Sequence, residues 1–281
     1  MKAFDYFSPG ELEEATRILA DYGLEGRALA GGTDLLIRLK RRQWQVRGVV
    51  SLKRIATLRH LSLNGELRLG ARVTLNDLIR SPLILEHFPV LAETAGTMAG
   101  VQVRSLATVG GNICNASPAA DMAPPLIALD ARVVIVGRDG ERVIPLDEFF
   151  IGPGKSVLTP GELVRELAVP HDDSTRVSYT KLEHREAMDI AIAGVGVSIK
   201  TEGQYCRDVR IVLGAVAPIP LRARQAEDFL RGSELTEENI REAARIAARE
   251  AKPIDDVRGS AWYRREMVEV LTRRILMGLR A

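Results

Sequence analysis

Few residues of this chain could hold a metal ion or an iron–sulfur cluster. The 281 residues include two cysteines, Cys114 and Cys206, and four histidines. A structural zinc site usually needs four Cys or His ligands, and a [2Fe–2S] cluster usually needs four thiolates. The histidines form no close pair in the sequence and no HExxH motif; they are His60, His87, His171 and His184. We therefore expect no metal site, and so few cysteines favour a reducing compartment over a disulfide framework.

Long apolar runs and an excess of one charge are also missing. The net charge is +2, from 39 basic and 37 acidic residues, so no overall field favours nucleic acid or an anionic membrane. No stretch reaches the roughly 18 apolar residues that span a bilayer. The N-terminal segment MKAFDYFSPGELEEATRILADYG lacks the apolar region of a signal peptide. We expect a cytoplasmic protein that binds no nucleic acid and has no membrane span.

The order of expected elements predicts an α+β protein. A first helix is expected from Ser8 to Gly23, because Ser8 can act as N-cap and form a capping box with Glu11. An Asp-Gly turn predicts a hairpin, and the polar segment HDDST (171–175) predicts a domain junction. Further strands are expected at 27–30, 46–52, 67–71, 131–137, 142–145, 163–170, 178–183, 191–200 and 209–216, and helices from Asp34, from Thr74, at 237–251 and at 262–279.

A glycine pair lies where an expected strand gives way to a helix, at Gly31 and Gly32. Paired glycines allow positive φ and let the backbone approach a ligand closely. Successive N–H groups and the start of a helix near Asp34 together favour an anion such as a pyrophosphate. The segment fits neither a GxGxxG motif nor a P-loop. An ordinary turn without a ligand remains the alternative explanation.

A second glycine pair, Gly110 and Gly111, lies in an unusual stretch at 99–125. The stretch is rich in small and polar residues, has little charge, and shows neither helical nor strand periodicity. Long irregular segments of compact domains are usually functional or disordered, and low charge argues against disorder. Asp121 could accept a hydrogen bond from a ribityl or ribose hydroxyl. Alternatively, the stretch is a small-residue packing turn, with Asp121 capping a short helix near Pro124.

No spacing in the sequence indicates catalytic side chains. We find no Ser-His-Asp or Cys-His arrangement and no acid–base pair of carboxylates. Lys181 and Asp189 have the character of surface charges, and Cys114 that of an inert packing residue. A chain that offers glycine loops and little reactive chemistry suits a protein whose cofactor supplies the reactivity.

These segments resemble the medium, FAD-binding subunit of molybdenum hydroxylases of the xanthine dehydrogenase and aerobic carbon monoxide dehydrogenase type. The resemblance covers essentially the whole chain. Its most specific parts are the two glycine loops, where TVGGN is followed by ASPxxD. The similar segments are AGGTDLL at 30–36, AGVQVRSLATVGGNICNASPAADMAPPLIAL at 99–129, FFIGPGK at 149–155, KLEHREAMDIA at 181–191 and RGSAWYRREM at 258–267.

The resemblance implies two domains. Residues 1–173 would form a vanillyl-alcohol-oxidase-like (PCMH-type) FAD-binding domain of two subdomains. Residues 176–281 would form a C-terminal domain with a three-stranded antiparallel sheet and helices. The resemblance implies that FAD contacts Leu29, Ala30, Gly31, Gly32, Thr33, Asp34 and Leu35 from the first loop, Thr108, Gly110, Gly111, Asn112, Ile113, Ala120 and Asp121 from the second, and Leu158 and Lys181 beyond.

The resemblance also implies partners. Hydroxylation would occur on a large molybdopterin-binding subunit, and electrons would cross a small [2Fe–2S] subunit to the flavin and then to NAD⁺, a quinone or oxygen. Such three-chain complexes are expected to double about a two-fold axis. The related type with a [4Fe–4S] insert is disfavoured by the two cysteines. The alternatives are a free-standing FAD oxidoreductase of the same fold and a scaffold that has lost FAD.

Overall fold

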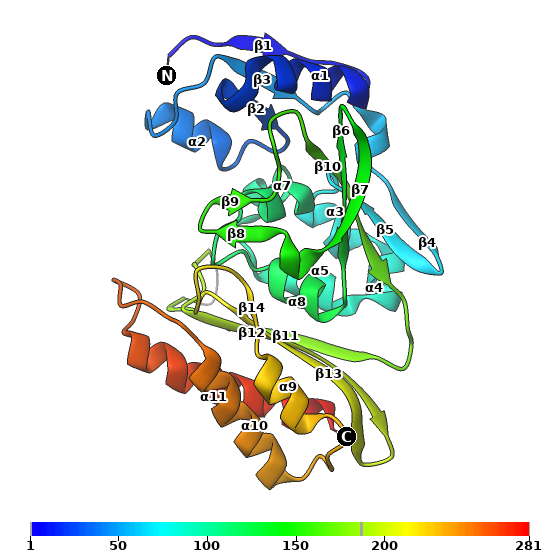
Figure 1. The fold of residues 1–281 in the computed structure, drawn as a ribbon, viewed down its shortest axis with the longest axis vertical. Helices are drawn as coiled ribbons and strands as arrows, with labels where there is room; N and C mark the ends of the chain where they lie inside the picture. The colour runs from blue at the N-terminus through cyan, green and yellow to red at the C-terminus, as the bar shows by residue number, and fades with distance from the viewer. Residues whose placement is uncertain (1, 186–187, 281) are drawn as a thin grey trace.

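The chain folds into three parts that follow one another along its length (Figure 1). The computed structural model describes residues 2–185 and 188–280. Met1, Ala281, and Glu186 and Ala187 of the segment KLEHREAMDIA lie outside the described residues. The elements mix helices with parallel and antiparallel sheets, so the predicted α+β class is confirmed.

The N-terminal part is a small parallel sheet covered by helices. Its elements are β1 (Asp5–Phe7), α1 (Leu12–Tyr22), η1 (Gly23–Glu25), β2 (Gly26–Leu29), α2 (Leu35–Lys40), β3 (Gly48–Ser51) and η2 (Ala56–Leu58). The strands lie in the order β1–β3–β2, with both pairs parallel. Leu12, Ala15 and Leu19 on one face of α1 are buried with Val50. This periodicity agrees with the amphipathic helix that the sequence predicts.

Helix α1 begins later than predicted. Ser8 is not its N-cap; Glu11 holds that position, and no side chain caps the helix. Gly10 follows Pro9, and a glycine within the first turn costs about 1 kcal/mol relative to alanine. The helix therefore begins beyond the glycine, at Leu12.

The middle part is a five-stranded antiparallel sheet with short helices packed against it. The strands lie in the order β4–β5–β10–β6–β7. Its elements are β4 (Leu61–Asn64), β5 (Glu66–Gly70), α3 (Leu75–Arg80), α4 (Pro82–His87), α5 (Pro89–Thr97), α6 (Val101–Arg104), α7 (Val109–Cys114), α8 (Ala123–Ala128), β6 (Arg132–Gly137), β7 (Gly140–Pro145), η3 (Leu146–Glu148), β8 (Phe150–Gly152), β9 (Lys155–Ser156) and β10 (Leu163–Pro170). The stretch 99–125, predicted to be irregular, contains α6, α7 and the start of α8.

The C-terminal part is an antiparallel sheet with helices on one face. Its elements are β11 (Arg176–Leu182), β12 (Ala193–Glu202), β13 (Tyr205–Gly214), β14 (Leu221–Arg222), α9 (Arg224–Leu230), α10 (Glu237–Glu250) and α11 (Ala261–Leu279). The sheet has four strands, so the expected three-stranded sheet is wrong by one. The additional strand, β14, is only two residues long and pairs with β13, which explains why no sequence pattern revealed it.

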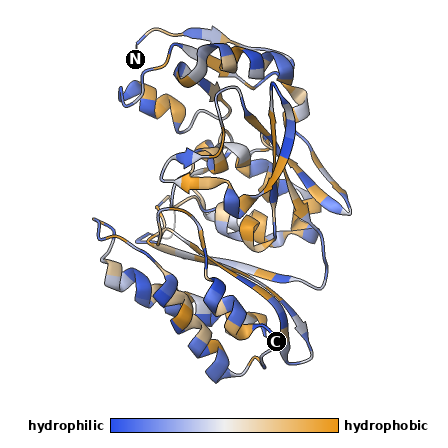
Figure 2. Ribbon diagram, in the orientation of Figure 1, coloured by the Kyte–Doolittle hydropathy of each residue, from blue (hydrophilic) through white to orange (hydrophobic). Residues whose placement is uncertain are grey.

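The middle and C-terminal parts share a buried core. Val212 of β13 belongs to the same apolar cluster as the helices and sheet of the middle part. The hydropathy colouring shows apolar residues along β6 and β10, whereas β7 at the sheet edge is largely hydrophilic (Figure 2). Among the described residues, no helix is both long and apolar enough to cross a membrane.

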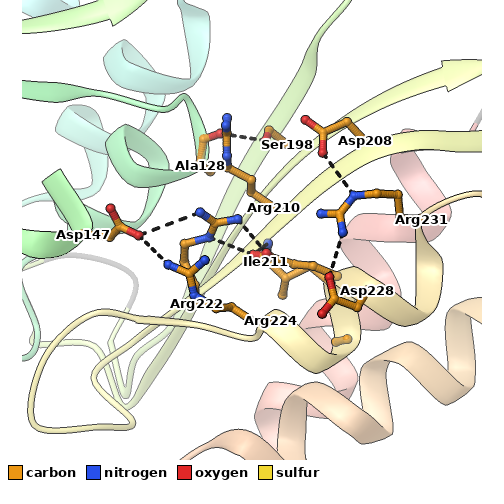
Figure 3. A network of polar contacts seen from close by, with 12 residues as sticks. Ala128, Asp147, Ser198, Asp208, Arg210, Ile211, Arg222, Arg224, Asp228 and Arg231 are labelled. Carbon is orange, nitrogen blue, oxygen red and sulfur yellow. Dashed lines mark hydrogen bonds and ion pairs between the residues drawn. The ribbon is translucent and has the colours of Figure 1, made fainter. Parts of the chain in front are cut away.

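Polar contacts also join these two parts. Arg222 and Arg224 converge on Asp147 of η3, with nitrogen–oxygen distances of 3.7 and 3.0 Å (Figure 3). The Ser198 hydroxyl donates to the carbonyl of Ala128 at the end of α8, at 2.6 Å. Helix α8 therefore packs on the face of the C-terminal sheet opposite α9–α11. The Ser198 hydrogen bond holds its C-terminal end, and the ion pairs of Asp147 lie next to it.

Candidate functional site

The first glycine loop connects β2 to α2. Gly32 adopts a φ of +76°, a conformation that favours glycine. Gly31 instead provides close approach, because a Cβ there would lie 1.9 Å from the carbonyl oxygen of Leu106. The backbone of the first loop thus touches the backbone that leads into the second loop. The two glycine pairs form one structural unit, although Gly31 and Gly110 are 79 positions apart in the sequence.

The second glycine loop is the beginning of α7. The Thr108 side chain caps this helix by accepting a hydrogen bond from the Gly111 N–H at 3.0 Å. The Gly110 N–H donates to the carbonyl of Ala71 at 3.0 Å, and a Cβ at Gly110 would lie 2.7 Å from that oxygen. Gly110 therefore packs α7 against the end of β5, as the packing-turn explanation expects. Gly110 and Gly111 both also line the cleft described below.

Side chains that the sequence analysis did not single out connect the two loops. The Arg38 guanidinium donates to Asn115 Oδ1 at 2.7 Å, and Asn115 Nδ2 donates to Asp34 Oδ1 at 3.2 Å. The Arg38 guanidinium also lies 4.3 Å from the centre of the Trp44 ring. Asn115 belongs to the conspicuous run after Gly111, but no sequence signal links Arg38 to it. These contacts fix the positions of the loops relative to each other.

The loops border a cleft of about 730 Å³ between the N-terminal and middle parts. Ligand sites typically range from about 300 to 1,000 Å³, so this volume can hold a large cofactor. Most of the segment from Gly154 to Val164 also lines the cleft, and Leu158 alone of this segment is among the expected FAD contacts. Arg27 and Lys155 also line the cleft and can balance the charge of a diphosphate. Burial lowers the pKa of the Arg27 guanidinium.

The cleft brings together most of the expected FAD contacts. Of the sixteen, eleven line it: Ala30, Gly31, Gly32, Thr33, Asp34, Leu35, Thr108, Gly110, Gly111, Asn112 and Leu158. Five do not: Leu29, Ile113, Ala120, Asp121 and Lys181. Asn112 Oδ1 is buried and has no hydrogen-bond partner among the described residues. Because buried polar atoms are almost always paired, this orphaned oxygen fits a ligand that carries a donor.

Asp121 and Lys181 lie together at the contact between the middle and C-terminal parts. Lys181 Nζ lies 3.3 Å from Asp121 Oδ2 and 3.0 Å from Glu183 Oε2, although the second contact lacks the geometry of a regular hydrogen bond. The Tyr179 hydroxyl donates to Asp121 Oδ1 at 2.9 Å. Only 3% of the Lys181 side chain is exposed, so the surface-charge interpretation of this residue is wrong.

The ionisation of this cluster follows from its burial. Burial raises the pKa of the Asp121 carboxyl, and the nearby Lys181 ammonium opposes that rise. Burial and the Asp121 charge raise the pKa of the Tyr179 hydroxyl well above its ordinary value. Helix α8 begins after Met122 without a side-chain cap, so the alternative role of Asp121 as a helix cap is also wrong. Asp121 instead holds the two parts together.

Cys114 lines the cleft, but its thiol is unreactive. Burial raises the pKa of its thiol to about 12, so almost none of it is thiolate at neutral pH. Both cysteines are free. This agrees with the interpretation of Cys114 as a packing residue.

Known proteins share both the sequence and the fold. Residues 2–172 match the family described as the FAD binding domain in molybdopterin dehydrogenase, and residues 178–279 match the CO dehydrogenase flavoprotein C-terminal domain. The glyceraldehyde dehydrogenase medium chain of Sulfolobus acidocaldarius is 34% identical, over 96% of this chain and 95% of the relative. A putative xanthine dehydrogenase FAD-binding subunit of Escherichia coli is 30% identical, over 96% and 94%.

A solved structure agrees equally well. The carbon monoxide dehydrogenase of Hydrogenophaga pseudoflava contains a chain that superimposes with a TM-score of 0.94 at 35% identity, covering 97% of this chain and 96% of that one. The two matched regions and the cleft define an FAD-binding flavoprotein with oxidoreductase function. The chain belongs to the family of FAD-binding subunits of molybdenum hydroxylases, which confirms the resemblance recognised in the sequence.

Proposed function

We propose that this chain relays electrons within a molybdenum hydroxylase complex. It would receive them from [2Fe–2S] clusters on a small partner subunit and pass them to an external acceptor such as NAD⁺, a quinone or oxygen. The observation that carries this proposal is the cleft, which joins two glycine loops and whose described lining residues include no histidine and no reactive thiol. FAD, when bound, supplies the two-electron redox chemistry that the side chains lack.

The residues that line the cleft would bind FAD. The backbone of 31–34 would bind the pyrophosphate, because glycines allow close approach and N–H groups attract anions. Asn112 Oδ1 would accept from a hydroxyl or amine of the cofactor. We retain all sixteen expected contacts as proposed ones. Asp121 and Lys181, which lie outside the cleft lining, would act from the contact between the middle and C-terminal parts.

We further propose that residues 1–173 form the FAD-binding domain, of the vanillyl-alcohol-oxidase-like (PCMH) type, and residues 176–281 the second domain. The parallel and five-stranded sheets would be the two subdomains of the first. The junction segment 171–175 follows β10 and precedes β11, which supports this boundary.

Partner subunits are part of the proposal. With two cysteines the chain cannot supply four thiolates for an iron–sulfur cluster, so the clusters of the proposed relay would belong to another protein. Relatives are named medium chains, as in the glyceraldehyde dehydrogenase of Sulfolobus acidocaldarius. We therefore propose a large molybdopterin-binding subunit, a small [2Fe–2S] subunit and a complex doubled about a two-fold axis. Free thiols at both cysteines suit the cytoplasm, where we propose that the complex works.

The cofactor can be tested directly. The purified chain should be yellow and release FAD, one per chain, when it is denatured and the extract is separated by chromatography. Free FAD at a hundred times its Kd should stabilise the folded chain by about 2.7 kcal/mol. Release of FMN, or no flavin uptake on reconstitution, would contradict the assignment of the cleft.

The electron relay needs a separate experiment. Co-expression with candidate large and small subunits should yield one complex by gel filtration. Reduced small subunit should bleach the flavin absorbance of this chain, and an added acceptor should restore it. A chain that elutes alone and oxidises a small molecule unaided would instead support the free-standing oxidoreductase.

A further inference from the structure

Two histidines that are far apart in the sequence meet beside the junction segment. His87 is the last residue of α4, and His171 directly follows β10. Their ring centres are 5.0 Å apart and their planes are nearly perpendicular, at 86°. No sequence pattern reveals this pair, because the two residues are 84 positions apart and only the folded chain brings the end of α4 next to the end of β10. The two histidines thus form a close pair in space, although they form none in the sequence.

A carboxylate completes the group. Asp173 Oδ1 lies 3.2 Å from His171 Nε2. One ligand atom from each of the three side chains lies within 4.8 Å of the others. Within residues 2–185 and 188–280, this is the one set of three His, Cys, Asp or Glu side chains that converges in this way. A second carboxylate is close, because Glu86 Oε1 lies 3.9 Å from His87 Nε2.

We propose that His87, His171 and Asp173 bind one divalent ion of the zinc class. Two imidazoles and a carboxylate are the ligands of Zn²⁺, Co²⁺ or Ni²⁺, whereas Ca²⁺ and Mg²⁺ prefer oxygen ligands alone. Zinc-to-nitrogen distances of about 2.0–2.1 Å place two ligands of a tetrahedral ion roughly 3.3 Å apart. The three ligand atoms, which lie within 4.8 Å of one another, must therefore move closer together to bind the ion.

The exposure of the side chains permits this adjustment. The Asp173 side chain is 91% exposed and the Glu86 side chain 74% exposed, so both can rotate without disturbing the core. Glu86 or water would complete the coordination. The intervening Asp172 is held elsewhere by Lys200 at 2.6 Å and by Ser174.

The position of the site gives the ion a structural role. His87 belongs to the middle part, whereas His171 and Asp173 lie on the segment that leads into the C-terminal part. A bound ion would fasten this segment to α4. The competing explanation is plain aromatic packing, because the Phe88 ring also lies 5.4 Å from the His171 ring. The proposal does not depend on the electron-relay function.

Zinc binding by the full-length, untagged, FAD-loaded chain tests the proposal. After chelator treatment and dialysis, titration calorimetry with Zn²⁺ should show one site per chain. His171→Phe keeps a ring against Phe88 but removes the ligand nitrogen, and His87→Phe does the same on α4. Each should weaken binding by roughly a hundredfold or more, because one of three ligands is lost. His184→Phe, at an exposed histidine outside the group, is the matched control.

A second readout identifies the ligands and a third tests the structural role. Co²⁺ should give visible absorption bands in the parent protein that are lost in the two phenylalanine variants and altered in Asp173→Asn. Zinc should raise the melting temperature of the parent and of His184→Phe, but not of His171→Phe. Equal zinc affinity in the parent and in His171→Phe overturns the proposal, and so does a parent chain that takes up no zinc at millimolar concentration.

Discussion

Gly31 determines how closely the two glycine loops approach each other. A methyl group there would overlap the Leu106 carbonyl and lie 3.1 Å from the Ala107 Cα, both parts of the backbone. Gly31→Ala should therefore push the loops apart and distort the cleft. We expect FAD affinity to fall at least tenfold and stability to fall by about 1–3 kcal/mol, the usual range for overpacking. Flavin titration and urea unfolding measure the two effects.

Gly96→Ala is the control for this change. Gly96 lies in α5, and an added Cβ would meet nothing within 4 Å. Alanine favours a helix over glycine by about 1 kcal/mol, so this variant should be as stable as the parent or more so. Its FAD affinity should be unchanged. A Gly31→Ala protein that binds FAD like the parent would show that the loop contact does not shape the cleft.

We expect the Asp121 carboxylate to contribute mainly to the stability of the fold. Both of its oxygens are engaged, one by Tyr179 and the other by Lys181. Asp121→Asn removes the charge that offsets the buried ammonium, and we expect a loss of about 1–3 kcal/mol. Tyr179→Phe removes one hydrogen bond but keeps the ion pair, and should cost about 1 kcal/mol. Urea unfolding of both variants compares them, and equal stability of Asp121→Asn and the parent would contradict the buried pair.

At this scale, the sequence revealed residues whose role is local and missed those whose role depends on distant partners. The predicted helix start at Thr74 is correct, and the structure shows a capping box between Thr74 and Asp77, which lie within one turn of each other. The link between Arg38 and Asn115 spans 77 positions and leaves no periodic signal. The sequence pattern around Lys181 is that of a surface charge, because only tertiary packing buries this side chain.

Among the elements, strands with strong patterns were predicted well. The predicted strand 163–170 agrees with β10 at both ends, and the Asp139–Gly140 turn joins β6 and β7 as expected. The helices at 101–104 and 109–114 were missed because they are only four and six residues long, and the second contains two glycines, which have low helical propensity. Tertiary contacts and the Thr108 cap stabilise α7 instead. The same unusual composition nevertheless pointed to the cleft.

Strand β10 also contains a buried acid that should make stability depend on pH. Glu166 accepts from Arg165, Arg68 and His60 at 2.8–2.9 Å. Burial alone would raise the pKa of this carboxyl, but those hydrogen bonds outweigh burial and hold the pKa below its ordinary value of 4.5. Because the pKa of Glu166 is lower in the folded state than in the unfolded state, its ionised form stabilises the fold fully at pH values above the unfolded-state pKa. That stabilisation is lost as the pH falls through the folded-state value.

Glu166→Gln should therefore lower stability at pH 7 but have little effect in acid. We expect a loss of about 1–2 kcal/mol at pH 7, since the partners are partly exposed to water. The difference from the parent should shrink steadily below pH 4.5, as urea midpoints across the pH range would show. Glu141→Gln, at an exposed partner of Arg165, should change stability by less than about 0.5 kcal/mol. A Glu166→Gln deficit that persists unchanged at pH 3 would contradict this origin.

For the whole molecule, the contact between the middle and C-terminal parts depends on two glycines that the sequence analysis did not notice. Gly196 of β12 and Gly214 of β13 lie against Pro124 of α8. A Cβ at Gly196 would lie 3.0 Å from the carbonyl carbon and oxygen of Pro124, and a Cβ at Gly214 would lie 2.9 Å from its ring. Strand patterns identify β12 and β13, but they do not reveal which helix covers the sheet. That information belongs only to the assembled fold.

Gly196→Val tests whether the two parts act as one folding unit. The valine side chain must displace the α8 backbone, which cannot move without disturbing the core around Val212 and the pair of Asp121 and Lys181. We expect a loss of about 1–3 kcal/mol, and protease cleavage near the junction segment 171–175 before global unfolding. Gly10→Val is the control, because an added Cβ there meets nothing within 4 Å. If Gly196→Val unfolds in one transition with the parent's midpoint and resists protease equally, the contact contributes little to the stability of the molecule. If instead its junction is cleaved early while FAD stays bound, the cleft depends on the N-terminal and middle parts alone.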